Sequence, residues 1–344
     1  MKSIRIMRPG EVALREENVP APSRGEALIR MRRVGICGTD YNIYRGEFQD
    51  RVNFPLRPGH EWAGEIIALG PETVGYQLGD RVTGESGVSC GVCEFCVKGE
   101  KYKCKNTRAV GTVNAWDGAM CEEFLFPVRD LLRIPDNVSM DEAALVEPAS
   151  NALMAVENAQ IGVGSTVVIM GTGPIGLAAA AIAKLYGAAT VISVGRSQFK
   201  LDMARDLGAT HVIDTRSEDP VARVMEITGG SGADAALEIS GSEALFRASL
   251  RAVHPHGKIV LVGFQEKPFE ININDLIFPL LSLLTAGGGW GGYAPKVLEL
   301  MGKGLLRLSP MITHRCLLQD VPSAIVNFKK HNAEKVKVMI CDQL

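Results

Sequence analysis

The stretch Val167-Val-Ile-Met-Gly-Thr-Gly-Pro-Ile-Gly176 determines how the rest of the sequence is interpreted. Its four apolar residues predict a parallel strand that is buried on both faces. The glycines that follow have the spacing of a turn that binds a pyrophosphate at a helix N-terminus. Pro174 suits the first helical turn, where its missing N–H costs nothing. The residues expected to contact the phosphates are Gly171, Gly173, Pro174, Ile175 and Gly176.

The residues around this turn alternate between strand-like and helix-like composition. Strands are expected at 166–170, 190–194, 211–213, 233–239 and 258–262, with a possible edge strand at 280–286. Helices are expected between them, at 174–186, 197–207, 220–227 and 243–252. This alternation predicts an α/β domain with a doubly wound parallel sheet over residues 151–286.

The segments outside this domain have a different composition. Residues 1–150 contain short strand-like runs at 27–34, 62–69 and 120–126, separated by Gly, Pro and Asp, which predicts a mostly β module. A glycine run at 287–292 precedes a tail with helical patterns at 295–301 and 321–330 and a strand-like run at 335–340.

Composition excludes several classes of function. The 344 residues include 37 basic and 39 acidic side chains, for a formal charge of −2, and no run of basic residues marks a surface for nucleic acid or an anionic membrane. Charged residues interrupt the apolar residues of the first ten positions, which argues against a signal peptide, and no unbroken apolar run reaches about 18 residues. We therefore expect no nucleic-acid or membrane partner and a cytoplasmic location.

Four of the eight cysteines lie close together, at Cys90, Cys93, Cys96 and Cys104. In an intracellular chain of this size such a cluster favours metal binding over disulfides. Four thiolates on one compact loop fill all the positions of a tetrahedral zinc site. Since no position is left for a substrate, this zinc should be structural.

A second group of metal-binding residue types is more dispersed. It comprises Cys37 in Gly35-Ile-Cys-Gly-Thr-Asp40, the pair His60-Glu61, and Glu147 in Val146-Glu-Pro-Ala-Ser150. One thiolate, one imidazole and one or two carboxylates can hold a zinc ion that keeps a position for water or substrate. Taken singly, a His after Gly is usually a turn residue, a lone Cys usually packs in a core, and a Glu before Pro usually begins a helix.

The order of these motifs along the chain resembles the zinc-dependent medium-chain alcohol dehydrogenases over essentially the whole sequence. Within that superfamily the sequence is most similar to the polyol (sorbitol-type) and L-threonine 3-dehydrogenase branch. The resemblance implies a GroES-like β-barrel catalytic domain at 1–150, completed by 287–344, and a Rossmann domain at 151–286. It also implies an active site between the domains and a homo-oligomer, either a tetramer or a dimer.

The resemblance assigns roles to individual residues. Cys37, His60, Glu61 and Glu147 match the catalytic zinc ligands, and which of the two carboxylates binds zinc directly stays open. Thr39 matches a hydroxyl that takes the proton of the alcohol while hydride passes to the nicotinamide ring, although a solvated turn residue is the alternative. Two zinc ions per chain are therefore expected. Asn42 stands where many relatives have a His of the proton relay.

The expected substrate is the secondary alcohol of a polyol, sugar acid or similar small polar metabolite. The threonine branch is the alternative, echoed in Val82-Thr-Gly-Glu85 and in Ser309-Pro-Met-Ile-Thr-His-Arg315. The run Glu85-Ser-Gly-Val-Ser-Cys90 lacks the His that this branch would have before the cysteines, and Glu147 also favours the polyol pattern. Tyr41, Tyr44, Arg45 and Trp290 could contact substrate or be ordinary surface and packing residues. A catalytically inactive structural or binding protein of the same fold is the alternative from another class.

The end of the second Rossmann strand predicts the cofactor. An acidic residue there would bind the ribose hydroxyls of NAD, but this chain has Gly195 followed by Arg196, with Lys200 one turn later. Glycine leaves space for a 2′-phosphate, and the two basic side chains can bind it. We therefore expect NADP(H) to be favoured over NAD(H). The alternative is that Arg196 and Lys200 are ordinary solvated helix residues.

Overall fold

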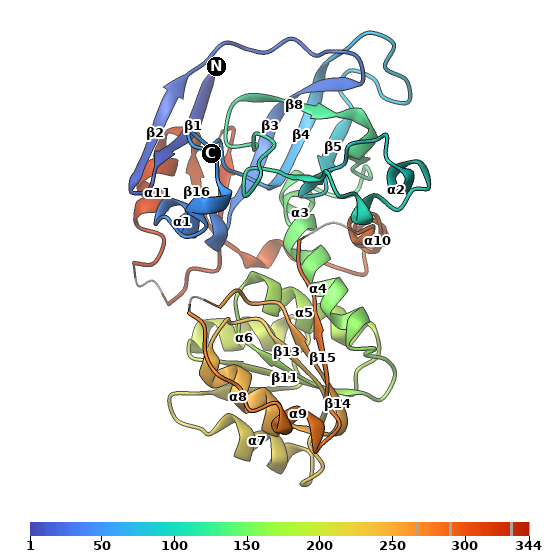
Figure 1. Cartoon of the computed structure of the whole chain (residues 1–344), viewed down its shortest axis with the longest axis vertical. Coiled ribbons are helices and arrows are strands. Elements are labelled where there is room, and N and C mark those ends of the chain that lie inside the picture. Colours follow the sequence, from blue (N-terminus) through green and yellow to red (C-terminus); the bar gives the residue numbers. More distant parts are fainter. Residues whose placement is uncertain (266, 289–290, 331–332, 344) are drawn as a thin grey trace. The chain divides into compact units, whose positions relative to one another are not determined.

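The computed structural model describes residues 1–265, 267–288, 291–330 and 333–343, which form two compact units (Figure 1). One unit comprises Met1–Glu147 and Gly288–Leu344, and the other comprises Pro148–Gly287. The sequence-based boundaries were 150/151 and 286/287, and the assignment of catalysis to one unit and cofactor binding to the other stays a prediction. Within the described residues no helix is long and apolar enough to cross a membrane.

The unit Pro148–Gly287 is built on a six-stranded sheet in which every neighbouring pair is parallel. The strand order is β12-β11-β10-β13-β14-β15. The strands are β10 (Thr166–Met170), β11 (Thr190–Gly195), β12 (His211–Asp214), β13 (Ala233–Glu238), β14 (Val253–Leu261) and β15 (Ser282–Thr285). Apolar residues of β10, β11 and β14 are buried in its core, as expected for a parallel sheet covered on both faces.

The helices of this unit are α5 (Pro174–Leu185), α6 (Gln198–Asp206), α7 (Pro220–Ile227), α8 (Glu243–Ala252), α9 (Asn274–Ile277) and all but the first two residues of α4 (Val146–Asn158). α5 and α6 pack against each other and against β10–β12, whereas α7 and α8 pack against each other and against β12–β14. The chain runs outward from β10 to β12 and then returns to β13 beside β10. Because crossovers are right-handed, this reversal places the two helix pairs on opposite faces of the sheet. The doubly wound parallel sheet predicted from the sequence is confirmed.

The predicted elements of this unit agree closely with the observed ones, with β14 as the main exception. Strand β10 and helices α7 and α8 have the predicted bounds, and β15 is the predicted edge strand. β14 begins at Val253 rather than Lys258. Its extra residues include Pro255 and Gly257, which disfavour a strand assignment from sequence, and the pairing with β13 shifts register there.

The other unit is built on a seven-stranded sheet with the order β16-β17-β3-β4-β5-β9, and β8 also pairs with β3. These strands are β3 (Glu26–Ile36), β4 (Glu61–Leu69), β5 (Arg81–Gly84), β8 (Glu123–Pro127), β9 (Leu131–Arg133), β16 (Ile312–Leu317) and β17 (Lys337–Cys341). Two small two-stranded sheets pair β1 (Lys2–Arg8) with β2 (Glu11–Glu16) and β6 (Gly87–Val88) with β7 (Arg108–Ala109). The mostly β module is confirmed, and β17 of the tail pairs directly with β3 of the N-terminal segment.

The helices of this unit are short: α1 (Gly38–Tyr44), α2 (Glu94–Val97), α3 (Met140–Ala144), α10 (Tyr293–Gly302) and α11 (Val321–Val326). The core is packed around Trp62, whose ring meets Phe124 and Phe126 edge-on at centroid distances of 4.9 and 5.0 Å. β16 was not expected from the sequence, and α11 is shorter than the helix expected at 321–330. His314 and Arg315 make β16 polar, and its burial is only partial, so its composition gave no strand signal.

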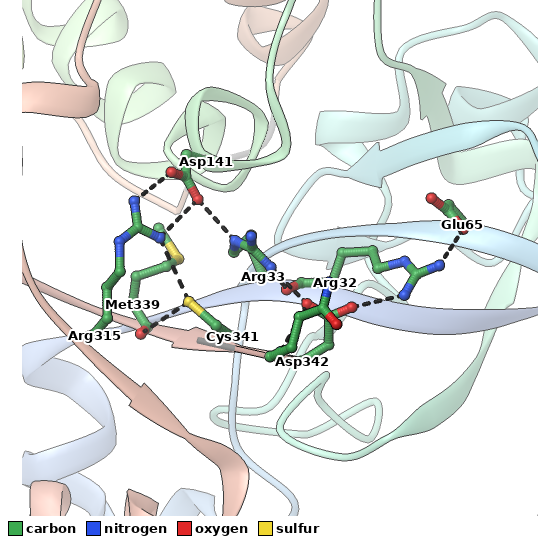
Figure 2. A network of polar contacts seen from close by, with 9 residues as sticks. Arg32, Arg33, Glu65, Asp141, Arg315, Met339, Cys341 and Asp342 are labelled. Atoms are coloured by element: carbon green, nitrogen blue, oxygen red, sulfur yellow. Dashed lines mark hydrogen bonds and ion pairs between the residues drawn. The ribbon is translucent and has the colours of Figure 1, made fainter.

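A network of charged side chains joins the C-terminal strand to the rest of this unit (Figure 2). Asp141 of α3 accepts hydrogen bonds from Arg33 of β3 and Arg315 of β16. Asp342, directly after β17, accepts from Arg32 at 2.6 Å and from Arg33 at 2.7 Å. Arg33 thus connects the two carboxylates, and the network holds α3, β3, β16 and the end of β17 together.

Candidate functional site

Cys37 lies at the junction between a strand and a helix. β3 ends at Ile36 and α1 begins at Gly38, so Cys37 is the N-cap residue and has an extended backbone. The carboxylate of Asp40 accepts a hydrogen bond from the Cys37 backbone N–H at 2.8 Å. This bond satisfies one of the free N–H groups at the start of the helix and fixes the position of the thiol.

His60 and Glu61 lie close to Cys37 at the start of the neighbouring strand β4. Glu61 begins β4 and is paired in register with Gly35 of β3, two residues before Cys37. The donor atoms of Cys37, His60 and Glu61 all lie within 4.8 Å of one another. A Cβ atom on Gly35 would come within 2.1 Å of Glu61 Oε2, so a glycine is needed there for the carboxylate to occupy its position.

Asp40 also faces the ring of His60, and the sequence analysis gave it no role. Its Oδ1 lies 3.8 Å from His60 Nδ1, both side chains are buried, and neither atom has a hydrogen-bond partner among the described residues. A carboxylate behind one ring nitrogen orients the other nitrogen towards a metal ion. The signal was present in the sequence as an acidic residue three positions after the N-cap Cys37.

The surroundings of His60 carry an excess of negative charge. Burial by itself would lower the pKa of His60, but the negative charges of Cys37, Asp40 and Glu147 raise it well above its ordinary value. Such surroundings also favour a divalent cation. A thiolate, an imidazole and a carboxylate form the mixed donor set of catalytic zinc sites, so these residues fit a zinc ion.

Lys337 of β17 is a further member of the site that the sequence analysis missed. Its Nζ donates to both carboxylate oxygens of Glu61, at 2.7 and 2.5 Å, and lies 3.4 Å from the backbone oxygen of Ile36. Burial would lower the pKa of Lys337, but Glu61 and Cys37 raise it. Nothing in the local sequence indicated this role, because the burial of Lys337 at the start of β17 depends on its pairing with Glu61 from a distant strand.

The two other predicted residues are placed nearby. Thr39, in the first turn of α1, has its hydroxyl 3.7 Å from the Cys37 sulfur. Glu147, in the first turn of α4, is not one of the three clustered donors, although its charge raises the pKa of both His60 and Lys337. The structure therefore brings Glu147 into the electrostatic surroundings of His60, and the choice between the two carboxylates as zinc ligand stays open.

The four clustered cysteines form a second candidate metal centre in the same unit. Cys93 is the N-cap of α2 and Cys96 lies within this helix, which places their sulfurs 3.5 Å apart. The sulfurs of Cys90, Cys93, Cys96 and Cys104 all lie within 4.8 Å of one another. The backbone N–H of Cys90 points to the sulfur of Cys104 at 3.5 Å. Four convergent sulfurs fit a structural zinc ion, which would have no open position.

The predicted substrate-contacting residues Tyr41 and Arg45 contact each other and neighbouring side chains. The Tyr41 ring stacks on Phe328 at a centroid distance of 5.6 Å, and Arg45 lies over Tyr41 and pairs with Glu47. Arg45 is thus partly neutralised by a neighbour. Trp290 lies outside the described residues.

The glycine turn of the other unit follows β10. Gly171 has a φ of 125°, which favours glycine, and a Cβ on Gly176 would come within 2.0 Å of the Gly171 backbone oxygen. Gly173 is the N-cap of α5, and Pro174 and Ile175 begin the helix. No atom lies within 4 Å of a Cβ built on Gly173, so the backbone there has room for a phosphate.

The predicted specificity residues lie at the end of the neighbouring strand. Gly195 is the last residue of β11, Arg196 follows it and is exposed, and Lys200 lies in α6. The next strand places Asp214 beside Gly195, a carboxylate that the sequence analysis did not consider. Arg216 donates to both oxygens of Asp214 and lowers its pKa to about 2. This carboxylate is therefore already paired with a cation.

Comparison with known proteins identifies the family. Residues 23–136 match the family model of the alcohol dehydrogenase GroES-like domain, and residues 174–303 match that of the zinc-binding dehydrogenases. An L-threonine 3-dehydrogenase of Pectobacterium carotovorum is 35% identical over 346 residues, which cover 98% of both chains.

Two solved structures are also similar, each with 30% sequence identity. One is a protein from Sinorhizobium meliloti, described as a zinc-binding dehydrogenase and bound to NADP, with a TM-score of 0.90 over 99% of this chain and 98% of the other. The second is an alcohol dehydrogenase of Escherichia coli complexed with NADH, with a TM-score of 0.89 over 99% of both chains. The chain is thus a member of the zinc-dependent medium-chain alcohol dehydrogenase family.

Proposed function

We propose that this dehydrogenase interconverts the secondary alcohol of a small polar metabolite with the corresponding ketone, and that a 3-hydroxy amino acid such as L-threonine is the first substrate to test. The convergence of Cys37, after the end of β3, with His60 and Glu61, at the start of β4, carries the proposal of alcohol chemistry. Similarity to an L-threonine 3-dehydrogenase over 98% of the chain supports the substrate class. This order of preference reverses the one drawn from the sequence, where the polyols came first.

Different residues of the site would bind the metal ion, transfer the proton and position the ligands. Cys37, His60 and either Glu61 or Glu147 would hold a zinc ion, which when bound supplies a Lewis acid that polarises the alcohol oxygen. The Thr39 hydroxyl, 3.7 Å from the Cys37 sulfur, would relay the alcohol proton, taking it up while releasing its own proton towards solvent. Asp40 orients the His60 ring, and Lys337 compensates the charge of Glu61.

A polyol or sugar-acid alcohol is the second candidate, favoured by the segment before the cysteine cluster. The threonine branch was expected to have a His here, but the segment carries Glu85 and Ser86. Glu85 accepts a hydrogen bond from the Gly292 backbone N–H at 3.0 Å, and Ser86 donates to the Gly288 oxygen. Both side chains are therefore bonded to Gly292 and Gly288 of the same unit. This bonding does not indicate a role in binding an amino acid.

We also propose that the cofactor is NADP(H). Gly195 places no side chain at the end of β11, and Arg196 is exposed beside it. Arg216 neutralises the one carboxylate on the neighbouring strand, so the local charge does not oppose a phosphate. The relative bound to NADP supports this preference, whereas the relative complexed with NADH shows that the fold also accepts the other cofactor.

A homo-oligomer, with a dimer as the smallest form, is supported by the edge of the parallel sheet. β15 is an edge strand, and the large apolar side chains exposed on it and just before it are Ile273, Ile277, Phe278, Leu280 and Leu283. An apolar edge strand of this kind is usually covered by another chain.

A reducing, cytoplasmic location is supported by the eight cysteines, none of which forms a disulfide in the described residues.

Steady-state kinetics of the zinc-loaded protein test the function. L-threonine, related 3-hydroxy amino acids, polyols and aldonates are assayed with both nicotinamide cofactors. The expected result is the highest kcat/KM for a 3-hydroxy amino acid, and loss of turnover in His60→Ala with retained cofactor binding. Turnover only with polyols or aldonates would favour the second candidate. Full activity of His60→Ala after chelation and dialysis would refute the metal-dependent reaction.

A further inference from the structure

The side chain of Thr172 occupies the space in which a residue at position 195 would place its first side-chain atom. A Cβ built on Gly195 would lie 2.5 Å from Thr172 Oγ1, 2.8 Å from Cγ2 and 3.3 Å from Cβ. Separations under 3.0 Å are well inside van der Waals contact, so neither of the first two can be accommodated without movement. The Gly195 φ is not in the left-handed region, so the backbone conformation does not require glycine. The close approach of Thr172 is therefore the reason for glycine at this position.

Backbone hydrogen bonds hold the two residues in this arrangement. The N–H of Gly171, next to Thr172, donates to the Val194 oxygen at 2.9 Å, which ties the glycine turn to the end of β11. On the other side, the Thr215 N–H donates to the Gly195 oxygen at 2.9 Å. Gly195 is thus bonded to the residue directly after β12, while its neighbour Val194 is bonded to the turn. A shift of β11 away from Thr172 would break at least one of these bonds.

Rotation of the threonine side chain cannot remove the overlap. Thr172 is β-branched, and two of its three staggered positions face Gly195, where Oγ1 and Cγ2 now lie. Any rotation by one staggered step still leaves a heavy atom in one of these two positions. Thr172 is also 8% exposed, so the surrounding atoms leave it little freedom to move away.

We propose that Thr172 is a specificity-determining residue for the cofactor, because its side chain excludes any side chain, including a carboxylate, from position 195. The proposal rests on the proposed NADP(H) preference and adds its steric origin. An acidic residue at the end of this strand binds the ribose hydroxyls of NAD and repels a 2′-phosphate. Position 195 can therefore carry an acidic residue only if Thr172 is also replaced by a smaller residue.

The steric part of the proposal is tested with Gly195→Ala, which adds only the Cβ atom. Overpacking at this site should lower the melting temperature by roughly 2–10 °C. Adding Thr172→Ala or Thr172→Ser should restore it, because alanine has no branch and serine can turn its single branch away. Adding Thr172→Val should not, because valine keeps both branches. Gly162→Ala is the matched control, since its Cβ would meet no atom within 4 Å.

The specificity part uses binding of NADH and NADPH, followed by cofactor fluorescence, to Gly195→Asp with and without Thr172→Ala. The single variant should bind both cofactors poorly, and the double variant should bind NADH at least tenfold more tightly than the single variant, with NADH preferred over NADPH. A Gly195→Asp protein with unchanged melting temperature and strong NADH binding would overturn the proposal, as would a double variant that binds NADH no better than the single one. A preference of the unmodified protein for NADH would refute the NADP(H) assignment alone, since the coupling between the two positions is measured independently of it.

Discussion

Lys337 Nζ lies 2.5 Å from Glu61 Oε2, and the two side chains are only 2% and 1% exposed. Lys337 belongs to β17 in the C-terminal tail, whereas Glu61 begins β4. The ion pair therefore joins the tail to the zinc-binding segment. It also means that a metal ion would compete with Lys337 for the Glu61 carboxylate. Without a metal ion, Lys337 balances the charge of the Glu61 carboxylate and keeps it near Cys37 and His60.

Lys337→Met should destabilise the protein by about 3–5 kcal/mol, because it leaves a buried carboxylate without its partner. Lys337→Met combined with Glu61→Gln should recover much of this loss, since no charge is then buried alone. Chemical denaturation measures both. Lys303→Met, which removes an exposed lysine paired with Glu299, is the control and should leave stability nearly unchanged. Equal stability of Lys337→Met and the unmodified protein would show that the pair is dispensable.

Asp40→Asn should weaken zinc binding at the mixed site by about 10–100-fold, the usual effect of removing a residue that orients a metal ligand. Asparagine keeps an oxygen for the Cys37 backbone N–H, so the helix cap is retained and only the charge behind His60 is lost. Metal content after dialysis against a competing chelator measures the effect. The four-sulfur site should keep its zinc, and Asp50→Asn, an exposed position, should keep both ions. Retention of both ions by Asp40→Asn would argue against an orienting role for this carboxylate.

Cys93→Ser should remove one zinc ion per chain and lower the melting temperature while the mixed site still binds metal. The physical reason is that a structural zinc contributes its binding free energy to folding. Elemental analysis and thermal denaturation together give the result. Cys316→Ser is the matched control, because Cys316 lies outside the cluster. An unchanged melting temperature after loss of the ion would remove the structural role of this site.

Asp141→Asn should reduce stability near neutral pH and much less in acid. Hydrogen bonds from Arg315 and Arg33 lower the pKa of Asp141 below its usual 3.8, so the folded state favours the charged carboxylate. Its contribution, about 1.5–3 kcal/mol for charge-assisted hydrogen bonds, is present above pH 4 and is lost as the pH falls through the lowered pKa. Denaturation of both proteins from pH 7 to pH 2 should show the two curves converging at the acid end. A stability difference independent of pH would contradict this origin.

The sequence predicted the fold well because its decisive signals are local. The apolar run before Gly171 and the regular alternation after it indicate a parallel sheet without any knowledge of long-range contacts. The positions of Asp40 and Lys337 depend on contacts between segments, and nothing in the local composition of 335–340 shows that Lys337 faces inward. The same holds for Thr172, whose importance comes from the approach of a neighbouring strand to Gly195. Sequence patterns therefore identified the metal-binding residue types, whereas the residues that position them required the structure.

Arg196 is the exposed cation directly after β11. If it binds the 2′-phosphate, Arg196→Ala loses a charged hydrogen-bonding contact of about 1.5–3 kcal/mol, which weakens NADPH binding by roughly ten- to a hundredfold. NADH lacks this phosphate, so its affinity should change far less. Arg251→Ala, an exposed arginine on α8 of the same unit, is the control and should leave both affinities unchanged. Equal weakening of NADPH and NADH binding by Arg196→Ala would show that Arg196 does not bind the 2′-phosphate. A higher kcat/KM of the unmodified protein with NADH would refute the cofactor assignment and leave the dehydrogenase family untouched.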